Sequence, residues 1–230
     1  MVEIHSLPKN WVVFDTAEEV AEILVKKILV LAQQAIEEKG FFSLVTAGGT
    51  TPQKCYELLS HQSADWSNWH IYIGDERALP ADDKDRNSVA LTQAWLFFDK
   101  IPTQNIHFMA TELGVELAAE AYQQLLQSVD TFDMVLLGMG EDGHTASLFP
   151  GHEYPSNQSV VIEQHSPKPP AQRVSLSYKR LSQAKVVYKL ITGQNKRDAV
   201  KHWLNHSGQG LPIAQVEGEK TWVYIDSNAL

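Results

Sequence analysis

Residues 132–151 read FDMVLLGMGEDGHTASLFPG, and this stretch indicates the fold more directly than any other part of the chain. Its first six residues form a mostly apolar run that is typical of a buried strand. Three glycines follow, and they allow a tight turn in which the backbone can approach a ligand closely: Gly138, Gly140 and Gly143. Open α/β sheets usually form their binding site at the carboxyl end of such a strand.

The same turn carries ionisable side chains suited to proton transfer. Glu141 and Asp142 lie between the second and third glycine, and His144 follows directly. An imidazole titrates near neutral pH, and a neighbouring carboxylate can orient it. The turn therefore supplies a candidate base, a candidate orienting acid and exposed backbone N–H groups in one place.

Strand-like and helix-like segments alternate on both sides of this turn. Short apolar runs predict strands at 11–14, 41–45, 69–73, 132–137, 159–162, 173–177, 185–191 and 222–225, with a further extended run at 105–109. Helical spacing, with a capping box at Thr16–Glu19 and a stop at Gly40, predicts helices at 17–39, 53–59, 87–98, 113–129 and 195–204. Strands separated by helices favour parallel βαβ units.

Composition limits the class of protein. The chain has 230 residues, 43% of them hydrophobic, and we expect one domain over residues 1–230. A net charge of −9 and the lack of a basic block argue against a nucleic-acid partner, and no apolar run approaches a membrane span. The single cysteine, Cys55, excludes an internal disulfide, and no secretory signal is visible at the start, so we expect a cytoplasmic protein.

A glycine- and threonine-rich turn follows the predicted strand 41–45. It contains Gly48, Gly49, Thr50 and Thr51, and Pro52 suits the first turn of the next helix. Free N–H groups at a helix N-terminus favour an anion, so this turn is a candidate phosphate site. It is not a Walker A loop, and an ordinary strand-to-helix turn would have a similar sequence.

Two further polar clusters come from other parts of the chain: Asp75–Arg77, and the pair of cations Arg173 and Lys196. Asp75, Glu76 and Arg77 come after the strand 69–73 and could hold sugar hydroxyls or a carbonyl oxygen, whereas residues 82–85 are read as a solvated loop. Arg173 follows the short proline-rich segment 166–170, which is read as a stiff surface loop. Lys196 opens a predicted helix. Each cation could reach a phosphate, but either could equally be an exposed surface group.

A dinucleotide site is the main competing interpretation of the central turn. Residues 138–143 match G-x-G-x-x-G after a strand, and Glu163 lies about 20 residues further on. Against this, Glu141 and Asp142 place carboxylates where a pyrophosphate would bind. Pro150 and the glycine after it also cut off the long helix that the site requires. We therefore expect no dinucleotide.

Other residues that could suggest catalysis or metal binding lack the partners that such sites need. His202 and His206 have the spacing of a metal-binding pair, but no acidic ligand lies nearby in sequence, so they are read as helix-surface residues. Cys55 has no local histidine and is read as a small packed residue. No G-x-S-x-G sequence indicates a serine hydrolase.

Taken in order, these segments resemble the motif series of the 6-phosphogluconolactonase family: TAGGTTP (46–52), GDER (74–77), GMGEDGHTASLFPG (138–151), RVSL (173–176) and TGQNK (192–196). The resemblance covers nearly the whole chain. It implies a doubly wound α/β fold with a mostly parallel sheet flanked by helices. It also implies hydrolysis of 6-phosphoglucono-δ-lactone to 6-phosphogluconate in the oxidative pentose phosphate pathway, without metal or cofactor.

The resemblance further implies roles for individual residues. His144 would be the general base, with Asp142 as its support, and Asp75 and Arg77 would line the sugar end. The phosphate would be held by Gly48, Gly49, Thr50, Thr51, Arg173 and Lys196. The sequence leaves open whether Arg77 or a backbone N–H of the glycine turn serves the oxyanion.

One position separates the lactonases from their relatives within the wider superfamily. Glucosamine-6-phosphate isomerase/deaminases share the glycine–threonine loop and the Asp-Gly-His core, but they carry a Glu that assists proton transfer where this chain has Phe149. A phenyl ring cannot carry a proton, which disfavours the deaminase. A non-catalytic sugar-phosphate sensor is the third hypothesis, and the intact Asp142 and His144 argue against it. The sequence leaves the oligomeric state open, and a monomer is compatible with it.

Overall fold

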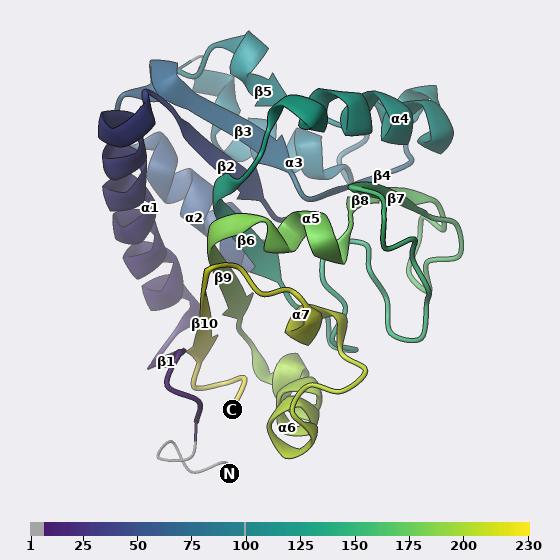
Figure 1. Ribbon diagram of the computed structural model, residues 1–230. Coiled ribbons are helices and arrows are strands. Elements are labelled where there is room, and N and C mark those ends of the chain that lie inside the picture. The colour runs from purple at the N-terminus through teal and green to yellow at the C-terminus, as the bar shows by residue number, and fades with distance from the viewer. Residues whose placement is uncertain (1–6, 99) are drawn as a thin grey trace.

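The computed structural model describes residues 7–98 and 100–230, and a parallel seven-stranded sheet is its centre (Figure 1). The strand order is β1-β10-β9-β6-β2-β3-β5, and every neighbouring pair is parallel. The strands are β1 (Trp11–Phe14), β2 (Phe42–Thr46), β3 (Trp69–Ile73), β5 (Ile106–His107), β6 (Phe132–Gly138), β9 (Ala184–Ile191) and β10 (Lys220–Asp226). The predicted parallel α/β architecture is confirmed.

Helices flank this sheet. In Figure 1, α1 (Ala17–Lys39) and α2 (Thr50–Ser60) lie together along its left side, and α5 (Tyr178–Ser182) crosses in front of it. The remaining α-helices are α3 (Asn87–Ala94), α4 (Val115–Leu125), α6 (Arg197–His206) and α7 (Pro212–Gln215). Short 3₁₀ segments occur at Trp66–Asn68, Leu96–Phe98, Thr103–Asn105, Thr111–Leu113, Leu126–Ser128 and Gln194–Lys196. No helix among the described residues is both long and apolar enough to cross a membrane.

The longest helix begins and ends where the sequence signals predict. The Thr16 side chain accepts the backbone N–H of Glu19 at 3.2 Å, and the Glu19 carboxylate accepts the backbone N–H of Asp15 at 2.9 Å. The first bond satisfies an N–H group that the first turn of a helix leaves free, and the second ties the residue before the N-cap to that turn. Gly40 ends the helix with φ +88°, a left-handed conformation that glycine adopts without strain.

A second, antiparallel sheet of three strands was not anticipated. It consists of β4 (Asp75–Arg77), β8 (Arg173–Leu176) and β7 (Val160–Glu163), in that order. The sequence predicted strands near β7 and β8 but no strand at 75–77. Gly74 explains the departure. Its N–H donates to Thr46 O at 3.0 Å, and its carbonyl accepts Leu176 N–H at 2.8 Å, so the chain passes there from one sheet to the other.

The order of the strands creates a crevice between β2 and β6. The chain continues from β2 toward β3 on one side, and from β6 toward β9 on the other. The loops after β2 and β6 therefore diverge at the carboxyl edge of the sheet, which is the usual ligand position in open α/β folds. The glycine–threonine turn follows β2, and the turn with His144 follows β6, so the topology brings the two candidate motifs together.

Candidate active site

A cavity of about 320 Å³ opens at this crevice. Of the residues to which the family resemblance assigns roles, all except Asp142 line it: Gly48, Gly49, Thr50, Thr51, Asp75, Arg77, His144, Arg173 and Lys196. They come from loops or strand ends that are far apart in the sequence. The structure therefore brings the separate candidate clusters into one site.

His144 and Asp142 form a close pair at the cavity, with His144 in its lining. Nδ1 of His144 lies 2.5 Å from Oδ1 of Asp142, and the same oxygen accepts the backbone N–H of His144 at 3.1 Å. Burial lowers the pKa of His144 below its ordinary value of 6.5, and the attraction of Asp142 only partly opposes that shift. Burial alone would raise the pKa of Asp142, but the charge and hydrogen bonds of His144 outweigh it and lower that pKa. At neutral pH the pair is thus a neutral imidazole beside a carboxylate.

Gly140 provides the space for this pair. A Cβ atom at position 140 would lie 2.0 Å from Nδ1 of His144 and 2.6 Å from Oδ1 of Asp142. The backbone closes the turn around the same residues, because Gly140 N–H donates to His144 O at 2.8 Å and Gly143 N–H donates to Gly140 O at 3.0 Å. Any larger residue at position 140 would displace the imidazole.

Phe149 packs against the imidazole. Its ring centroid lies 4.7 Å from that of His144, and its side chain is 1% exposed. The guanidinium carbon of Arg173 lies 5.6 Å from the centroid of the same ring. Phe149 therefore contacts both the base candidate and a cation of the cavity wall, and it supplies no ionisable group of its own.

The glycine–threonine turn after β2 has the form of an anion site. Gly49 has φ +109° and precedes the first residue of α2, and no side chain caps that helix. N–H groups in the first turn are therefore left for a ligand, and the helix dipole favours negative charge there. The hydroxyls of Thr51 and Thr192 lie 2.5 Å apart, which ties α2 to the end of β9.

Arg173 has a second role that the sequence did not indicate. Its side chain is 4% exposed, and Nη2 donates to the carbonyls of Lys168 at 2.8 Å and Pro169 at 3.1 Å, while Nε donates to Pro170 O at 3.1 Å. The proline-rich segment was read as a plain surface loop, but Lys168 and Pro169 line the cavity. Arg173 thus holds one wall of the site in place as well as facing it.

Two lysines approach the cavity from different loops. Burial lowers the pKa of Lys196, and the nearby Lys168 lowers it further, while Glu141 and Asp142 oppose the shift. Lys168 Nζ lies 3.1 Å from Glu141 Oε1 in an ion pair that is partly exposed. The sequence analysis missed Lys168, because a lysine in a proline-rich loop carries no local signal of a binding role.

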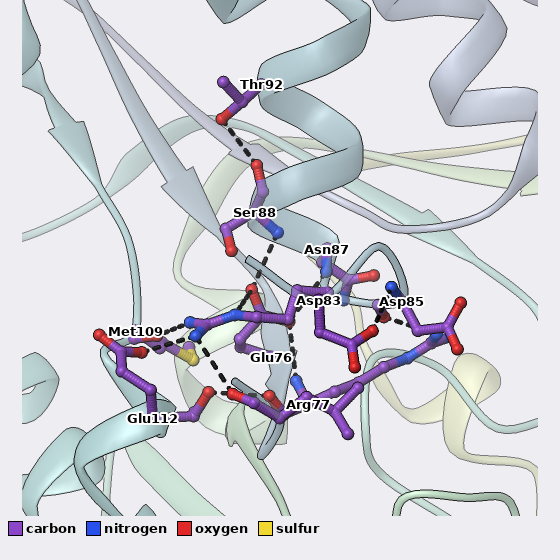
Figure 2. A network of polar contacts seen from close by, with 12 residues as sticks. Glu76, Arg77, Asp83, Asp85, Asn87, Ser88, Thr92, Met109 and Glu112 are labelled. Atoms are coloured by element: carbon purple, nitrogen blue, oxygen red, sulfur yellow. Dashed lines mark hydrogen bonds and ion pairs between the residues drawn. The ribbon is translucent and has the colours of Figure 1, made fainter. Parts of the chain in front are cut away.

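Asp75 and Arg77 line the cavity, and each also forms hydrogen bonds with other residues of the protein. Ser147 Oγ donates to Asp75 Oδ2 at 2.7 Å, and Arg77 Nη1 donates to the Asp85 carbonyl at 2.7 Å. Burial raises the pKa of Asp75, with the Ser147 hydrogen bond opposing that shift. Glu76 does not line the cavity, because its buried carboxylate binds backbone N–H groups, as Figure 2 shows. It is therefore not placed to hold sugar hydroxyls.

The described residues do not form the arrangement that a dinucleotide site or a metal site needs. Within residues 7–98 and 100–230, the next helix or strand after β6 is β7, so no helix follows the G-x-G-x-x-G turn. Glu163 accepts hydrogen bonds from Tyr154 and the His165 backbone. The described residues contain no group of three His, Cys, Asp or Glu arranged to hold a metal ion.

Taken together, the features describe an α/β protein with a candidate anion-binding loop and a histidine–carboxylate pair at the switch point of its sheet. Residues 15–225 match the family model described as glucosamine-6-phosphate isomerases/6-phosphogluconolactonase. The chain belongs to this family.

Individual relatives agree with that assignment. A 6-phosphogluconolactonase of Thermotoga maritima is 33% identical over 205 residues, which cover 89% of this chain and 92% of the relative. A probable chloroplastic 6-phosphogluconolactonase of Oryza sativa subsp. indica is 32% identical and covers 91% of this chain and 72% of its own length. The crystal structure of a Thermotoga maritima 6-phosphogluconolactonase superposes with a TM-score of 0.87 at 31% identity, over 94% of this chain and 99% of that one.

Proposed function

We propose that this chain is a hydrolase that converts 6-phospho-D-glucono-1,5-lactone to 6-phospho-D-gluconate, a step of the oxidative pentose phosphate pathway. The observation that carries the proposal is the His144–Asp142 pair, which lies at the wall of the same cavity as the anion loop after β2. The 6-phosphogluconolactonase names of the relatives support the choice of substrate.

His144 is proposed as the general base. Because Asp142 accepts the Nδ1 proton, the lone pair of the neutral ring is at Nε2, and no described residue forms a hydrogen bond with Nε2. Nε2 takes a proton from water as the water oxygen attacks the lactone carbonyl carbon. The tetrahedral intermediate then collapses, the bond between C1 and the ring oxygen breaks, and the imidazolium returns the proton to that oxygen.

Water is proposed as the nucleophile because, among the described residues, the cavity lining contains no cysteine or serine and no threonine hydroxyl bound to a base. Cys55 is fully buried, its pKa is raised by burial, and it does not line the cavity. The hydroxyls of Thr51 and Thr192 bind each other. A δ-lactone is an activated ester, so a positioned base and an oriented substrate meet the chemical demand.

The phosphate is proposed to bind at the loop of Gly48, Gly49, Thr50 and Thr51, with Arg173 and Lys196 as counter-charges. These groups would orient the lactone through a part of the substrate that does not react. Asp75 and Arg77 are proposed to lie at the sugar end. The single cysteine also supports a reducing compartment, and we propose the cytoplasm.

A coupled assay that follows 6-phosphogluconate formation, corrected for spontaneous hydrolysis, tests the proposal. The same preparation is offered glucosamine 6-phosphate while ammonia is measured. We expect lactone hydrolysis and no ammonia, because Phe149 puts a buried phenyl ring against His144 where the deaminases have a Glu. Ammonia release without lactone hydrolysis would favour the deaminase, and tight 6-phosphogluconate binding without either reaction would favour a sensor.

A further inference from the structure

Glu76 is a buried carboxylate that stabilises the start of α3 (Figure 2). Its Oε1 accepts the backbone N–H groups of Arg77 and Asn87, each at 2.8 Å, and its Oε2 accepts that of Ser88 at 2.9 Å. No side chain of the residue before α3 caps the helix. Glu76, which belongs to β4, therefore caps α3 in place of the preceding residue. Its negative charge is favourable at a helix N-terminus.

Arg86 holds this carboxylate from the other side. Its Nε lies 3.5 Å from Glu76 Oε2, its Nη1 lies 2.6 Å from Glu112 Oε2, and its Nη2 donates to Met109 O at 3.0 Å. A buried carboxylate is costly unless it is paired and hydrogen-bonded, and Glu76 is both. The position of the first residue of α3 is therefore fixed.

That first residue is Asn87, and its amide reaches the cavity wall. Nδ2 donates to the carbonyl of Asp75 at 2.9 Å and to its Oδ1 at 3.1 Å. The other carboxylate oxygen of Asp75 accepts the hydroxyl of Ser147 at 2.7 Å, three residues after His144. A chain of hydrogen bonds thus joins α3 to the turn that carries the base candidate.

The position of the Asn87 amide also explains why residue 48 is a glycine. A Cβ atom at Gly48 would lie 2.3 Å from Oδ1 and 3.0 Å from Cγ of Asn87, and its three nearest heavy atoms all belong to that side chain. The φ angle of Gly48 lies outside the left-handed region, so the backbone conformation does not itself require glycine. On its other side, the Gly48 carbonyl lies 3.4 Å from the Cβ position of Gly138, at the end of β6.

We propose that Asn87, fixed by Glu76, is a positioning residue that sets the place of the loop at Gly48 relative to the turn at His144. The side chain contacts the first loop directly and reaches the second through Asp75 and Ser147. The inference rests on the proposed function in one respect, namely that the loop at Gly48 binds the substrate phosphate.

A double-mutant cycle between positions 48 and 87 tests this. The variants are Gly48→Ala, Asn87→Ala and the combination, each measured for 6-phosphogluconate affinity by calorimetry, for KM and kcat, and for Tm. We expect each single change to weaken binding by about tenfold, with a smaller effect on kcat. The double variant should bind at least about threefold better than the product of the single effects predicts, because Asn87→Ala removes the group that a methyl at position 48 would strike.

The matched control is Asn105→Ala, which removes an exposed amide that donates to Ser67 O at 3.0 Å, outside the cavity. It should leave affinity, KM and kcat unchanged. Glu76→Gln keeps the shape of the side chain but places an NH₂ group against N–H donors, so it should lower Tm and weaken 6-phosphogluconate binding in the same direction as Asn87→Ala.

Strictly additive effects at positions 48 and 87 would overturn the inference. So would a Gly48→Ala variant that binds as tightly as the native protein, a result that needs no variant of Asn87. If the native protein binds 6-phosphogluconate but does not hydrolyse the lactone, the proposed function fails while the cycle can still be completed in affinity and Tm. If hydrolysis is observed and the cycle is additive, only the role of Asn87 fails.

Discussion

Nδ1 of His144 lies 2.5 Å from Oδ1 of Asp142, within a turn of only three residues from one to the other. The same carboxylate oxygen accepts the His144 backbone N–H, so it fixes both the ring and the chain that carries it. This contact shows that Asp142 is the carboxylate that touches the imidazole, the partner that the family resemblance implies. It also fixes the tautomer, with the Nδ1 proton on the side of Asp142 and the lone pair at Nε2.

The first prediction concerns His144→Gln. Glutamine has a similar reach but cannot accept a proton at neutral pH, so turnover should fall by about 10²–10⁴-fold, the usual contribution of a positioned base. The affinity for 6-phosphogluconate, measured by calorimetry, should stay near the native value because the proposed phosphate contacts come from other loops. A variant with near-native turnover would refute the role of His144.

The second prediction concerns the pH dependence of kcat/KM. The pKa of His144 is lowered from 6.5, so the imidazole stays neutral through pH 7 and activity should fall only as the pH drops below about 6.5. Asp142 raises that pKa toward its ordinary value, and Asp142→Asn should therefore move the acid limb to still lower pH while reducing turnover. The rates must be corrected for spontaneous hydrolysis at each pH. An acid limb in Asp142→Asn that moves to higher pH would contradict the assigned pair.

The third prediction concerns Gly140→Ala. The new methyl group would lie 2.0 Å from Nδ1 of His144, so the ring must move out of the Asp142 contact. We expect kcat to fall nearly as far as in His144→Gln, with 6-phosphogluconate affinity close to native. The reason is steric, since the φ angle of Gly140 lies outside the left-handed region. A Gly140→Ala variant with native kcat would show that the pair tolerates displacement.

Much of the fold could be predicted because it depends on local signals. The strand Trp69–Ile73 and the helix Ala17–Lys39 were placed correctly from apolar periodicity, a capping box and a stop at Gly40. The antiparallel sheet escaped prediction because Asp75–Arg77 is only three residues long and polar. Its strand pairing depends on β8, almost a hundred residues further on, and no local pattern encodes such a partner.

In the candidate site too, residues with a local sequence signal were predicted and residues placed by tertiary contacts were not. Motifs at strand ends identified His144 and the loop at Gly48, and the parallel topology brought them together. Lys168 and Asn87 were missed because each acquires its place only through tertiary contacts, one through the carbonyls held by Arg173 and the other through the carboxylate of Glu76. Glu76 was grouped with the ligand-binding candidates because the sequence does not distinguish a buried carboxylate that caps a helix from an exposed one that binds a ligand.

The fourth prediction concerns dinucleotides. The 21 residues 139–159 between β6 and β7 include the G-x-G-x-x-G turn after Gly138 and contain no helix, so the helix N-terminus that would bind a pyrophosphate is missing from the described part of the chain. Titration with NAD or NADP should give no saturable signal at physiological concentrations, and calorimetry measures this directly. Tight binding of either nucleotide would reverse the interpretation of the turn.

The fifth prediction separates the two cations proposed to bind phosphate. Lys196→Ala should raise KM for the phosphorylated lactone and leave Tm nearly unchanged, because no hydrogen bond or ion pair of the Lys196 side chain with another described residue would be lost. Arg173→Ala should raise KM and also lower Tm, because the carbonyls of Lys168, Pro169 and Pro170 lose their buried donor. KM, kcat and thermal unfolding of both variants distinguish these outcomes.

The substrate comparison makes the fifth prediction specific to phosphate. Unphosphorylated glucono-δ-lactone lacks the dianion, so Lys196→Ala should affect its hydrolysis much less than that of the phosphorylated lactone. Lys220→Ala removes an exposed lysine at the amino end of β10, away from the cavity, and should affect neither. Equal losses on both lactones would argue against a phosphate role for Lys196. A pure stability loss in Arg173→Ala, with KM unchanged, would restrict Arg173 to supporting the proline-rich wall.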